Sequence, residues 1–311
     1  MKLLIGIDGG GTKTDFIACD MEGNLIKRII KAGSNPIDIG MESALNLMIE
    51  GINELTYGYS ENDILSIYAG LSGGTTGDNK ERVNAKLREK FSRDIIINNH
   101  TDGLNALICG VGNNDGCVVI SGTGTVGFGR RSGKVVQIGG YGYLIDRGGS
   151  GYDYGRDALY YSLCDLDKRG EKTLITDILE QKLGGIRKSI DHIYKKGKSY
   201  IASFAPAVFE AYKAGDKIAI RIVEENSCEI AKIFNALARY QEERVCDVVL
   251  AGSVFKDFKI IQPHLEHYLE HDFHYIFINM PPVCGAVIQA AINAGIVDLD
   301  QFKKKLNGGL Q

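Results

Sequence analysis

The first thirty residues alternate between apolar strands and short polar turns. Residues 3–7 (LLIGI) form an apolar run that leads into Asp8 and the stretch GGGTK, and residues 14–19 (TDFIAC) then alternate with a period of two. A polar turn at 22–24 leads into a third apolar run at 25–30. This pattern predicts a three-stranded meander. The glycine-rich stretch is therefore expected to be the tip of a β-hairpin, unlike the Rossmann turn and the Walker A loop, which continue into a helix.

The same pattern returns about one hundred residues later. Residues 117–140 (CVVISGTGTVGFGRRSGKVVQIGG) again read as strand, Gly/Thr tip, strand, polar turn and strand. Aligning residues 7–12 with residues 120–125 keeps the glycines of the two tips in step and places Ser121 opposite Asp8. Two further strands, at 66–74 and 247–255, both end in a loop of small residues. The chain therefore reads as an internal duplication.

Helical patterns lie between these strands. Apolar residues recur at spacings of three and four in the segments 41–55, 79–91, 153–163, 172–183 and 216–240. Each half is thus expected to fold as a meander followed by alternating helices and strands, which is an α/β arrangement. The 311 residues exceed what a single core usually spans, so two domains are expected.

Composition excludes several classes of function. The net charge of −3 indicates no basic surface for nucleic acid. No stretch approaches the roughly 18 apolar residues of a membrane span, and the apolar run at the amino terminus is too short for a signal peptide. The seven cysteines are scattered without a Cys-x-x-Cys pair, which is typical of thiols in a reducing compartment. We therefore expect a cytoplasmic protein that binds neither nucleic acid nor membrane.

The two glycine- and threonine-rich tips suggest a bound nucleotide. Backbone N–H groups in such tips can approach phosphate closely, so one tip on each of two similar domains could hold a nucleotide between them. Asp8 would repel a polyphosphate unless Mg²⁺ lay between them, which makes Asp8 a candidate metal ligand through water. The alternative is that Asp8 only orders the turn. Because the glycine- and threonine-rich tip occurs twice, we favour the interpretation of Asp8 as a metal ligand.

Taken in order, the motifs resemble those of a known family. Six of them follow the order found in the sugar kinase/actin/heat-shock ATPase superfamily: IGIDGGGTKTD, GLSGG, TDG, ISGTG, GGYGYLIDRGGSGYDYGRDAL and LAGSVF. The chain is most similar to N-acetylglucosamine kinases and to the related ATPases that activate benzoyl-CoA reductase, from residue 3 to about residue 295. The resemblance implies two duplicated actin-like (ribonuclease H-like) α/β domains with a nucleotide cleft between them. The first would span residues 1–112, with the tail 285–311 packed back on it, and the second residues 113–284.

The resemblance also implies roles for single residues. The first phosphate loop would comprise Gly9, Gly10, Gly11, Thr12, Lys13 and Thr14, with Asp8 near Mg²⁺. The second phosphate loop would comprise Ser121, Gly122, Thr123, Gly124 and Thr125, and the adenosine would contact Gly252 and Ser253. The sugar would contact Ser34, Asn35, Ser72 and Gly73, although Asn35 could instead be a turn residue before Pro36.

Asp102, in the stretch NNHTDGLNAL, matches the catalytic carboxylate of these sugar kinases and would also contact the sugar. A buried carboxylate can take the proton of the acceptor hydroxyl as the new bond to phosphorus forms. The alternative is a helix N-cap, because Thr101 and Asp102 precede the helical residues 104–107. The two roles can coexist.

One stretch departs from the family pattern. Tyr141 stands where N-acetylglucosamine kinases usually have Trp and would offer its ring to the sugar, unless it is a core residue. The family sequence Gly-Asp-Glu-Gly-Ser then reads Asp-Arg-Gly-Gly-Ser at 146–150, so Arg147 replaces the sugar-binding Asp, or Asp146 has taken over its role. A guanidinium would suit a sugar with a carboxylate, such as N-acetylmuramic acid. The alternative is a salt bridge from Arg147 to Asp146, Asp153 or Asp157.

The expected activity is an ATP- and Mg²⁺-dependent amino-sugar kinase. It would transfer the γ-phosphate to the C6 hydroxyl of N-acetylglucosamine, N-acetylmuramic acid or both, with the domains closing to exclude water. Two alternatives are an activator ATPase without a sugar acceptor and a sugar-binding sensor without turnover. The scattered cysteines argue against the activator, and Asp102 argues against the sensor. A homodimer is common among such kinases and is expected here.

Overall fold

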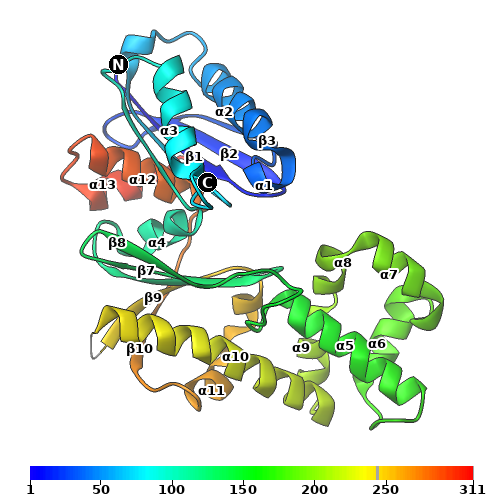
Figure 1. The fold of residues 1–311 in the computed structure, drawn as a ribbon. Coiled ribbons are helices and arrows are strands. Elements are labelled where there is room, and N and C mark those ends of the chain that lie inside the picture. The colour runs from blue at the N-terminus through cyan, green and yellow to red at the C-terminus, as the bar shows by residue number, and fades with distance from the viewer. Residues whose placement is uncertain (243–244, 311) are drawn as a thin grey trace. The chain divides into compact units, whose positions relative to one another are not determined.

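The structure, a computed structural model, describes residues 1–242 and 245–310. The chain divides into two compact units, each with its own five-stranded sheet (Figure 1). Unit 1 comprises Met1–Asn114 together with the chain from Phe277 onward, and unit 2 comprises Asp115–Ile276.

The sheet of unit 1 has the strand order β3-β2-β1-β4-β5. Its first three strands form the antiparallel meander that the period-two pattern predicts, and the other two strands run parallel to β1. The strands are β1 (Leu3–Gly9), β2 (Lys13–Cys19), β3 (Leu25–Ala32), β4 (Ile64–Leu71) and β5 (Ile96–His100). The carboxyl ends of the three parallel strands lie at one edge, which is where open α/β sheets bind ligands.

Helices from both ends of the chain pack on this sheet. α2 contacts β2 and β3, whereas α12 contacts β1 and β4 and packs against α4. The helices of unit 1 are α1 (Pro36–Ile39), α2 (Met41–Leu55), the 3₁₀ turn η1 (Glu61–Asp63), α3 (Asn79–Lys90), α4 (Gly103–Val111), α12 (Val283–Asn293) and α13 (Leu299–Gly308). The small-residue helix near the carboxyl end therefore contributes to the core of the amino-terminal sheet.

The sheet of unit 2 has the order β10-β9-β6-β7-β8. Its strands are β6 (Gly116–Ser121), β7 (Thr125–Arg131), β8 (Lys134–Gly139), β9 (Val245–Ala251) and β10 (Asp272–Phe277). Its helices are α5 (Gly151–Leu166), α6 (Leu174–Leu183), η2 (Arg187–Ser189), α7 (Ile190–Lys196), α8 (Lys198–Ala202), α9 (Ala205–Lys213), α10 (Lys217–Gln241), η3 (Val254–Asp257) and α11 (Phe258–Glu266).

The two sheets share one topology, which confirms the expected duplication. In each sheet a meander forms one half, and its first strand pairs in parallel with the fourth strand of the unit. The alignment of the two tips was wrong by one residue, however. The pairs that close the hairpins are Gly9 with Thr14 and Ser121 with Thr125, so Ser121 corresponds to Gly9, and Ile120 corresponds to Asp8.

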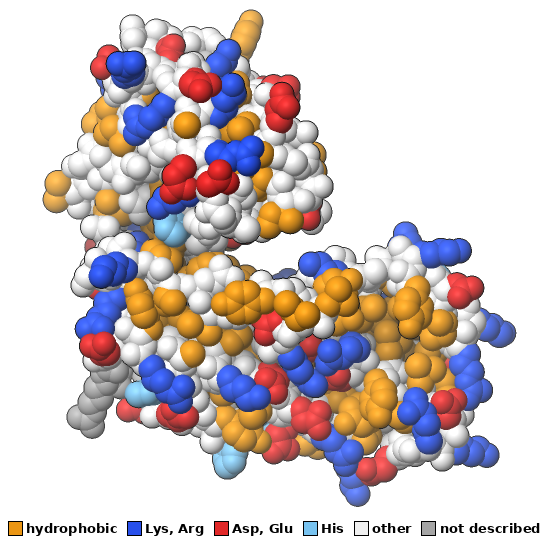
Figure 2. Space-filling view, viewed as in Figure 1, with side chains coloured by type: hydrophobic (Ala, Val, Ile, Leu, Met, Phe, Trp, Pro, Cys, Tyr) orange, Lys and Arg blue, Asp and Glu red, His pale blue; other side chains and the backbone are white. Residues whose placement is uncertain are grey.

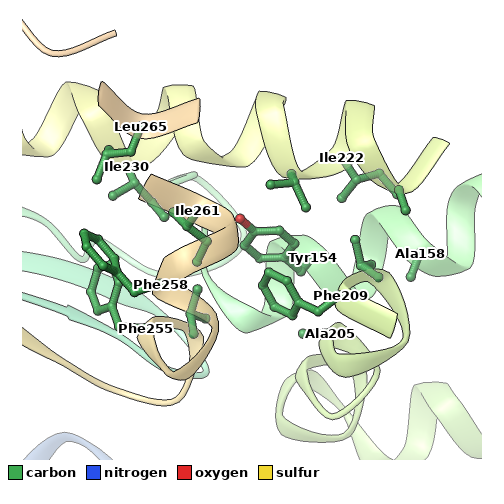
Figure 3. Packing of buried hydrophobic residues seen from close by; sticks show 14 of the residues in the cluster. Tyr154, Ala158, Ala205, Phe209, Ile222, Ile230, Phe255, Phe258, Ile261 and Leu265 are labelled. Carbon is green, nitrogen blue, oxygen red and sulfur yellow. The ribbon is translucent and has the colours of Figure 1, made fainter. Parts of the chain in front are cut away.

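Most of the core of unit 2 lies under the long helix α10. The rings of Tyr154 of α5 and Phe209 of α9 are tilted by 41° with their centroids 4.9 Å apart. Ile222 of α10 lies above them, and Ile230 of the same helix lies near Ile261 and Leu265 of α11 (Figure 3). The connection between β8 and β9 thus builds a helical layer that the shorter connection between β3 and β4 lacks. Among the helices of the described residues, none is both long and apolar enough to cross a lipid bilayer.

Candidate functional site

The first glycine-rich tip is a tight hairpin at the carboxyl end of β1. Gly10 N donates to Lys13 O at 2.9 Å, and Ser34 N, just after β3, donates to Gly10 O at 3.0 Å. Thr12 and Lys13 are exposed, and Lys13 Nζ lies 4.0 Å from the carboxylate of Asp15. Lys13 is therefore the cation that this tip can offer to a phosphate.

Thr14 has a structural role in the same hairpin. Its side chain is fully buried, and its hydroxyl donates to Ala32 O at 2.7 Å. Of the side chains predicted for the first phosphate loop, this one is already engaged by the backbone of β3.

Asp8 lies just before the tip and is held by a residue that the motifs did not indicate. Asn105 Nδ2, on α4, donates to Asp8 Oδ1 at 2.6 Å. Burial raises the pKa of Asp8 to about 7, the hydrogen bond from Asn105 opposes that rise, and the nearby carboxylate of Asp102 adds to it. Asp8 is thus a carboxylate whose negative charge lacks a sufficient counter-charge in the protein.

Asp102 stands at the carboxyl end of β5, where α4 begins. It occupies the N-cap position, but its side chain makes no capping hydrogen bond to the helix. Thr101 Oγ1 donates to Asp102 Oδ1 at 3.2 Å, and burial raises the pKa of Asp102 above its ordinary value. The carboxylate is therefore available for chemistry and is a better proton acceptor than an exposed Asp.

The predicted sugar contacts of unit 1 come together beside the tip. Ser72 N donates to Gly9 O at 2.7 Å, and Ser34 Oγ lies so close to Gly9 that a Cβ there would overlap it. A Cβ at Gly73 would lie 2.7 Å from Asn35 Oδ1. Two chain segments far apart in sequence thus meet at the ends of β1 and β4.

Ser34 and Asn35 differ in which hydrogen-bonding groups of their side chains remain free. Ser34 Oγ is buried and has no hydrogen-bond partner among the described residues. Asn35 Oδ1 accepts from Ile37 N at 2.9 Å, which caps α1 as expected of an Asn before Pro36. Asn35 can therefore offer a ligand mainly its amide N–H groups.

The second tip is held by hydroxyl groups at its base and by the N-terminus of a helix. Ser121 Oγ and Thr125 Oγ1 lie 3.0 Å apart, and Ser121 Oγ donates to Gly149 O at 3.1 Å. Gly151 N, in the first turn of α5, donates to Gly122 O at 2.7 Å. The carbonyl groups of the tip thus accept hydrogen bonds from the N-terminus of α5, where the helix dipole favours negative charge.

Gly252 fits tightly against this tip. Its φ of +98° lies in a region that favours glycine, and a Cβ there would overlap Ser121 O. Ser253 follows and is exposed. The strand-end loop after β9 therefore packs directly against the second tip.

A cavity of 260 Å³ opens in unit 2 beside these loops. Its walls come from the second tip, from the loop after β9 and from helices α8 and α9. The lining residues are Gly122, Thr123, Gly151, Ser199, Ala202, Ser203, Ala205, Pro206, Phe209, Ser253, Val254 and Asp257. The contribution of residues 199–209 was missed, because these helices are short and have no counterpart in the first half of the chain.

The loop from Tyr141 to Arg147 lies between β8 and α5. Tyr141 is 66% exposed, so it is not a core residue, and Asp146 Oδ2 accepts from Tyr141 N at 3.0 Å. Leu144 and Ile145 are more than 80% exposed. Apolar side chains are visible on the surface of unit 2 (Figure 2). An aromatic and apolar surface is thus available to a ligand here.

Arg147 forms one of the salt bridges that the sequence left open. Its Nη2 donates to Asp157 Oδ2 at 2.8 Å, and Asp157 also accepts from Arg156 and from Asn226. The Arg147 side chain remains 38% exposed, and among the described residues only its Nη2 makes a hydrogen bond. The guanidinium is thus held in place by Asp157, and its other N–H groups remain available to a ligand.

The residues of unit 1 fit Mg²⁺ bound mainly through the nucleotide. Asp8 supplies the hard oxygen atoms that Mg²⁺ prefers, and a cation would offset the burial and the repulsion by Asp102 that raise the pKa of Asp8. Among the residues that the structure describes, no group of three or more His, Cys, Asp or Glu side chains is arranged to hold a metal ion. One carboxylate, phosphate oxygens and water would therefore form the coordination shell.

Comparison with known proteins identifies the family. The model of the BadF/BadG/BcrA/BcrD ATPase family matches residues 5–290, which is nearly the whole chain. The chain belongs to this family. Membership of the BadF/BadG/BcrA/BcrD ATPase family confirms the resemblance that the motifs indicated, and the two glycine-rich tips both lie within the matched residues.

The chain is similar to two curated relatives and to a solved structure. An N-acetylmuramic acid/N-acetylglucosamine kinase of Clostridium acetobutylicum is 32% identical over 306 residues, covering 93% of this chain and 98% of the relative. An N-acetyl-D-glucosamine kinase of Dictyostelium discoideum is 31% identical over 273 residues, covering 81% and 86%. A solved structure from Chromobacterium violaceum, provisionally assigned as an N-acetylglucosamine kinase, has a TM-score of 0.72 at 21% identity and covers 93% and 98%. The last supports the two actin-like α/β units.

Proposed function

We propose that this protein is an ATP-dependent amino-sugar kinase that phosphorylates the C6 hydroxyl of N-acetylglucosamine, N-acetylmuramic acid or both. The observation that carries the proposal is the state of Asp102. Its carboxylate ends β5, makes no helix-capping bond and has a raised pKa, as a general base for an acceptor hydroxyl requires. The two curated relatives, whose names state these substrates, support the same conclusion.

The nucleotide half of the reaction belongs to unit 2 in this proposal. The cavity of 260 Å³ would take the adenosine, with Ser253 and Val254 on one wall and α9 on another. Gly122 and Thr123 line the same cavity, so the phosphates would leave it along the second tip. The N-terminus of α5 would stabilise their negative charge.

The acceptor half belongs to unit 1. The C6 oxygen would attack the γ-phosphorus, the bond from that phosphorus to the β–γ bridging oxygen would break, and ADP would leave. Asp102 would take the hydroxyl proton, and Lys13 and the backbone of the first tip would stabilise charge on the transferred group. Asp8 would hold Mg²⁺, which supplies further neutralisation of the phosphates when bound.

We propose sugar contacts for each unit by itself. Ser34, Ser72, Gly73 and the amide of Asn35 would contact its hydroxyl groups, and the exposed ring of Tyr141 would cover an apolar face. Arg147 would bind the lactyl carboxylate of N-acetylmuramic acid through the N–H groups that Asp157 does not use.

We also propose where in the cell the protein acts, how it assembles and where its domains begin and end. None of the seven cysteines, all of which lie in the described residues, forms a disulfide, which supports a reducing cytoplasm. We propose that the domains follow the two compact units and that the protein acts as a homodimer. Sedimentation measurements would test the dimer directly.

The test of the proposed function is identification of the product. The protein would be incubated with Mg²⁺–ATP and N-acetylglucosamine, N-acetylmuramic acid, glucosamine, N-acetylmannosamine or glucose, and the products examined by ³¹P NMR. We expect a 6-phosphate of one or both N-acetylated sugars. Inorganic phosphate alone, formed equally without sugar, would instead indicate an ATPase of the activator type.

A further inference from the structure

Asn105 links the helix that Asp102 begins to the carboxylate of Asp8. It is fully buried in the first turn of α4, the helix that Asp102 begins. Its Nδ2 reaches across to β1 and donates to Asp8 Oδ1 at 2.6 Å. One amide thus ties the helix that carries Asp102 to the side chain of Asp8.

Two glycines make room for this amide. A Cβ at Gly70, on β4, would overlap the carboxamide of Asn105. A Cβ at Gly285, on α12, would overlap the backbone carbonyl of Asn105. Neither glycine has a positive φ, so it is the close approach of β4 and α12 that excludes a side chain. β4 therefore packs against the side chain of Asn105, and α12 packs against its backbone.

Asn105 is not explained by folding stability alone. Its Oδ1 is buried and has no hydrogen-bond partner among the described residues, which is unfavourable for a buried acceptor. An apolar side chain of the same volume would avoid this cost. The benefit that remains is the hydrogen bonding of Nδ2, which donates to Asp8 Oδ1 at 2.6 Å and, over the longer distance of 3.5 Å, to Ile7 O.

That hydrogen bond leaves the two oxygens of Asp8 unequal. Oδ1 is occupied by Asn105, whereas Oδ2 has no hydrogen-bond partner in the described part of the chain. Oδ2 is not fully buried, so it keeps some accessible surface. The fixed carboxylate thus presents one oxygen to the edge of the sheet where the first tip lies.

We propose that Asn105 is a positioning residue of the active site, which orients the Asp8 carboxylate so that Oδ2 serves the metal–phosphate end of ATP. Asn105 itself touches neither substrate nor metal. The inference rests on the proposed kinase function, because it assigns Asp8 to the Mg²⁺ of ATP. Residues of this kind typically change metal affinity by roughly tenfold to a hundredfold.

The test compares Asn105→Leu with a matched control, Asn235→Leu. Asn235 is also a buried amide on a helix, and its Nδ2 donates to Tyr268 O at 2.9 Å in unit 2. Binding of Mn²⁺ in the presence of ADP would be followed by EPR, and the Mg²⁺ concentration for half-maximal velocity would be measured at saturating ATP and sugar. Asn105→Ser, which keeps a shorter donor, would serve as the second variant.

We expect Asn105→Leu to weaken Mn²⁺ binding about tenfold or more and to raise the Mg²⁺ requirement by a similar factor. Asn105→Ser should fall between Asn105→Leu and the wild type, and it carries the test alone if the Leu variant does not fold. Asn235→Leu should bind Mn²⁺ like the wild type. Unchanged Mn²⁺ binding in both Asn105 variants, or an equal loss in Asn235→Leu, would overturn the inference.

The two proposals can fail separately. A wild-type protein that binds Mn²⁺ with ADP but forms no sugar phosphate would refute the kinase. The EPR comparison would still decide whether Asn105 positions Asp8, because that readout needs no turnover.

Discussion

The two units share a sheet topology but close their hairpin tips with different chemistry. In unit 1 the tip is flanked by two ionisable groups, Asp8 and Asp102, and Asn105 donates a hydrogen bond to Asp8. In unit 2 the corresponding tip is closed by the hydroxyls of Ser121 and Thr125. The duplicated framework positions two similar loops, and the residues around each loop give it different chemical groups.

The connections after the third strand differ as much as the tips do. Between β3 and β4 the chain forms two helices and a short 3₁₀ turn, whereas between β8 and β9 it forms α5 to α10. Two of these additional helices, α8 and α9, line the cavity of unit 2. The difference between the units is therefore concentrated outside the shared sheet.

The largest effect on folding should come from two matched core substitutions. Phe16→Ala in unit 1 and Phe209→Ala in unit 2 remove equally apolar buried rings, and each should lower the free energy of unfolding by about 3–5 kcal/mol. Only Phe209 also lines the cavity, so only Phe209→Ala should weaken ATP binding in protein that remains folded. Urea unfolding and calorimetric titration with ATP would measure the two effects. Equal weakening of ATP binding would contradict the assignment of the cavity.

Gly252→Ala should have a slightly smaller effect, confined to unit 2. The new Cβ would combine a positive φ with overlap on Ser121 O, which together cost about 2–4 kcal/mol. Gly124→Ala is the control, since its Cβ would meet no atom within 4 Å. Thermal unfolding would show a lowered midpoint for the first variant and little change for the second. A Gly252→Ala protein as stable as the control would contradict the close packing of the two loops.

The pH dependence of stability should distinguish the two tips. The pKa of Asp8 rises from 3.8 to about 7 on folding, so the folded state binds the proton more tightly than the unfolded state. Without Mg²⁺ and nucleotide, this group should lower the free energy of unfolding by up to about 1.4 kcal/mol per pH unit as the pH rises from about 4 to 7.

Asp8→Asn should remove that slope, whereas Ser121→Ala should leave it unchanged, because a hydroxyl does not titrate in this range. Urea unfolding at several pH values in EDTA would measure the slopes. Identical slopes for the wild type and Asp8→Asn would show that Asp8 ionises normally in the folded protein.

The smallest effect should come from Arg147→Gln. The side chain is 38% exposed, so stability should change by less than about 1 kcal/mol. Loss of the guanidinium should lower kcat/KM for N-acetylmuramic acid about tenfold more than for N-acetylglucosamine. Competition between the two sugars would measure the ratio. An equal loss for both sugars would leave Arg147 with only its structural salt bridge to Asp157.

Regular patterns in the sequence accounted for most of the fold. The period-two alternation before and after each tip predicted both meanders, and the long helices α2, α5 and α10 were visible from their apolar spacing. These elements are predictable because each buries one continuous apolar face. The helices at 190–213 were not predicted, since they are short and pack through scattered residues such as Phe204 and Val208.

The parts of the site that depend on backbone shape could be predicted from the sequence. The parts that depend on single side-chain contacts could not. Glycine runs mark both tips, whereas the family resemblance indicated Ser34. Asn105 carries no such signal, because its role depends on where β1, β4 and α12 approach each other. The salt bridge of Arg147 was one of several alternatives that only the structure could separate.

The most direct test of the kinase assignment is ADP release by the wild type and by Asp102→Asn, with and without N-acetylglucosamine or N-acetylmuramic acid. The account predicts release that depends on sugar and that falls about 10²- to 10⁴-fold in the variant, with Mg²⁺–ATP binding retained. Release that is independent of sugar, or that Asp102→Asn leaves unchanged, would contradict it.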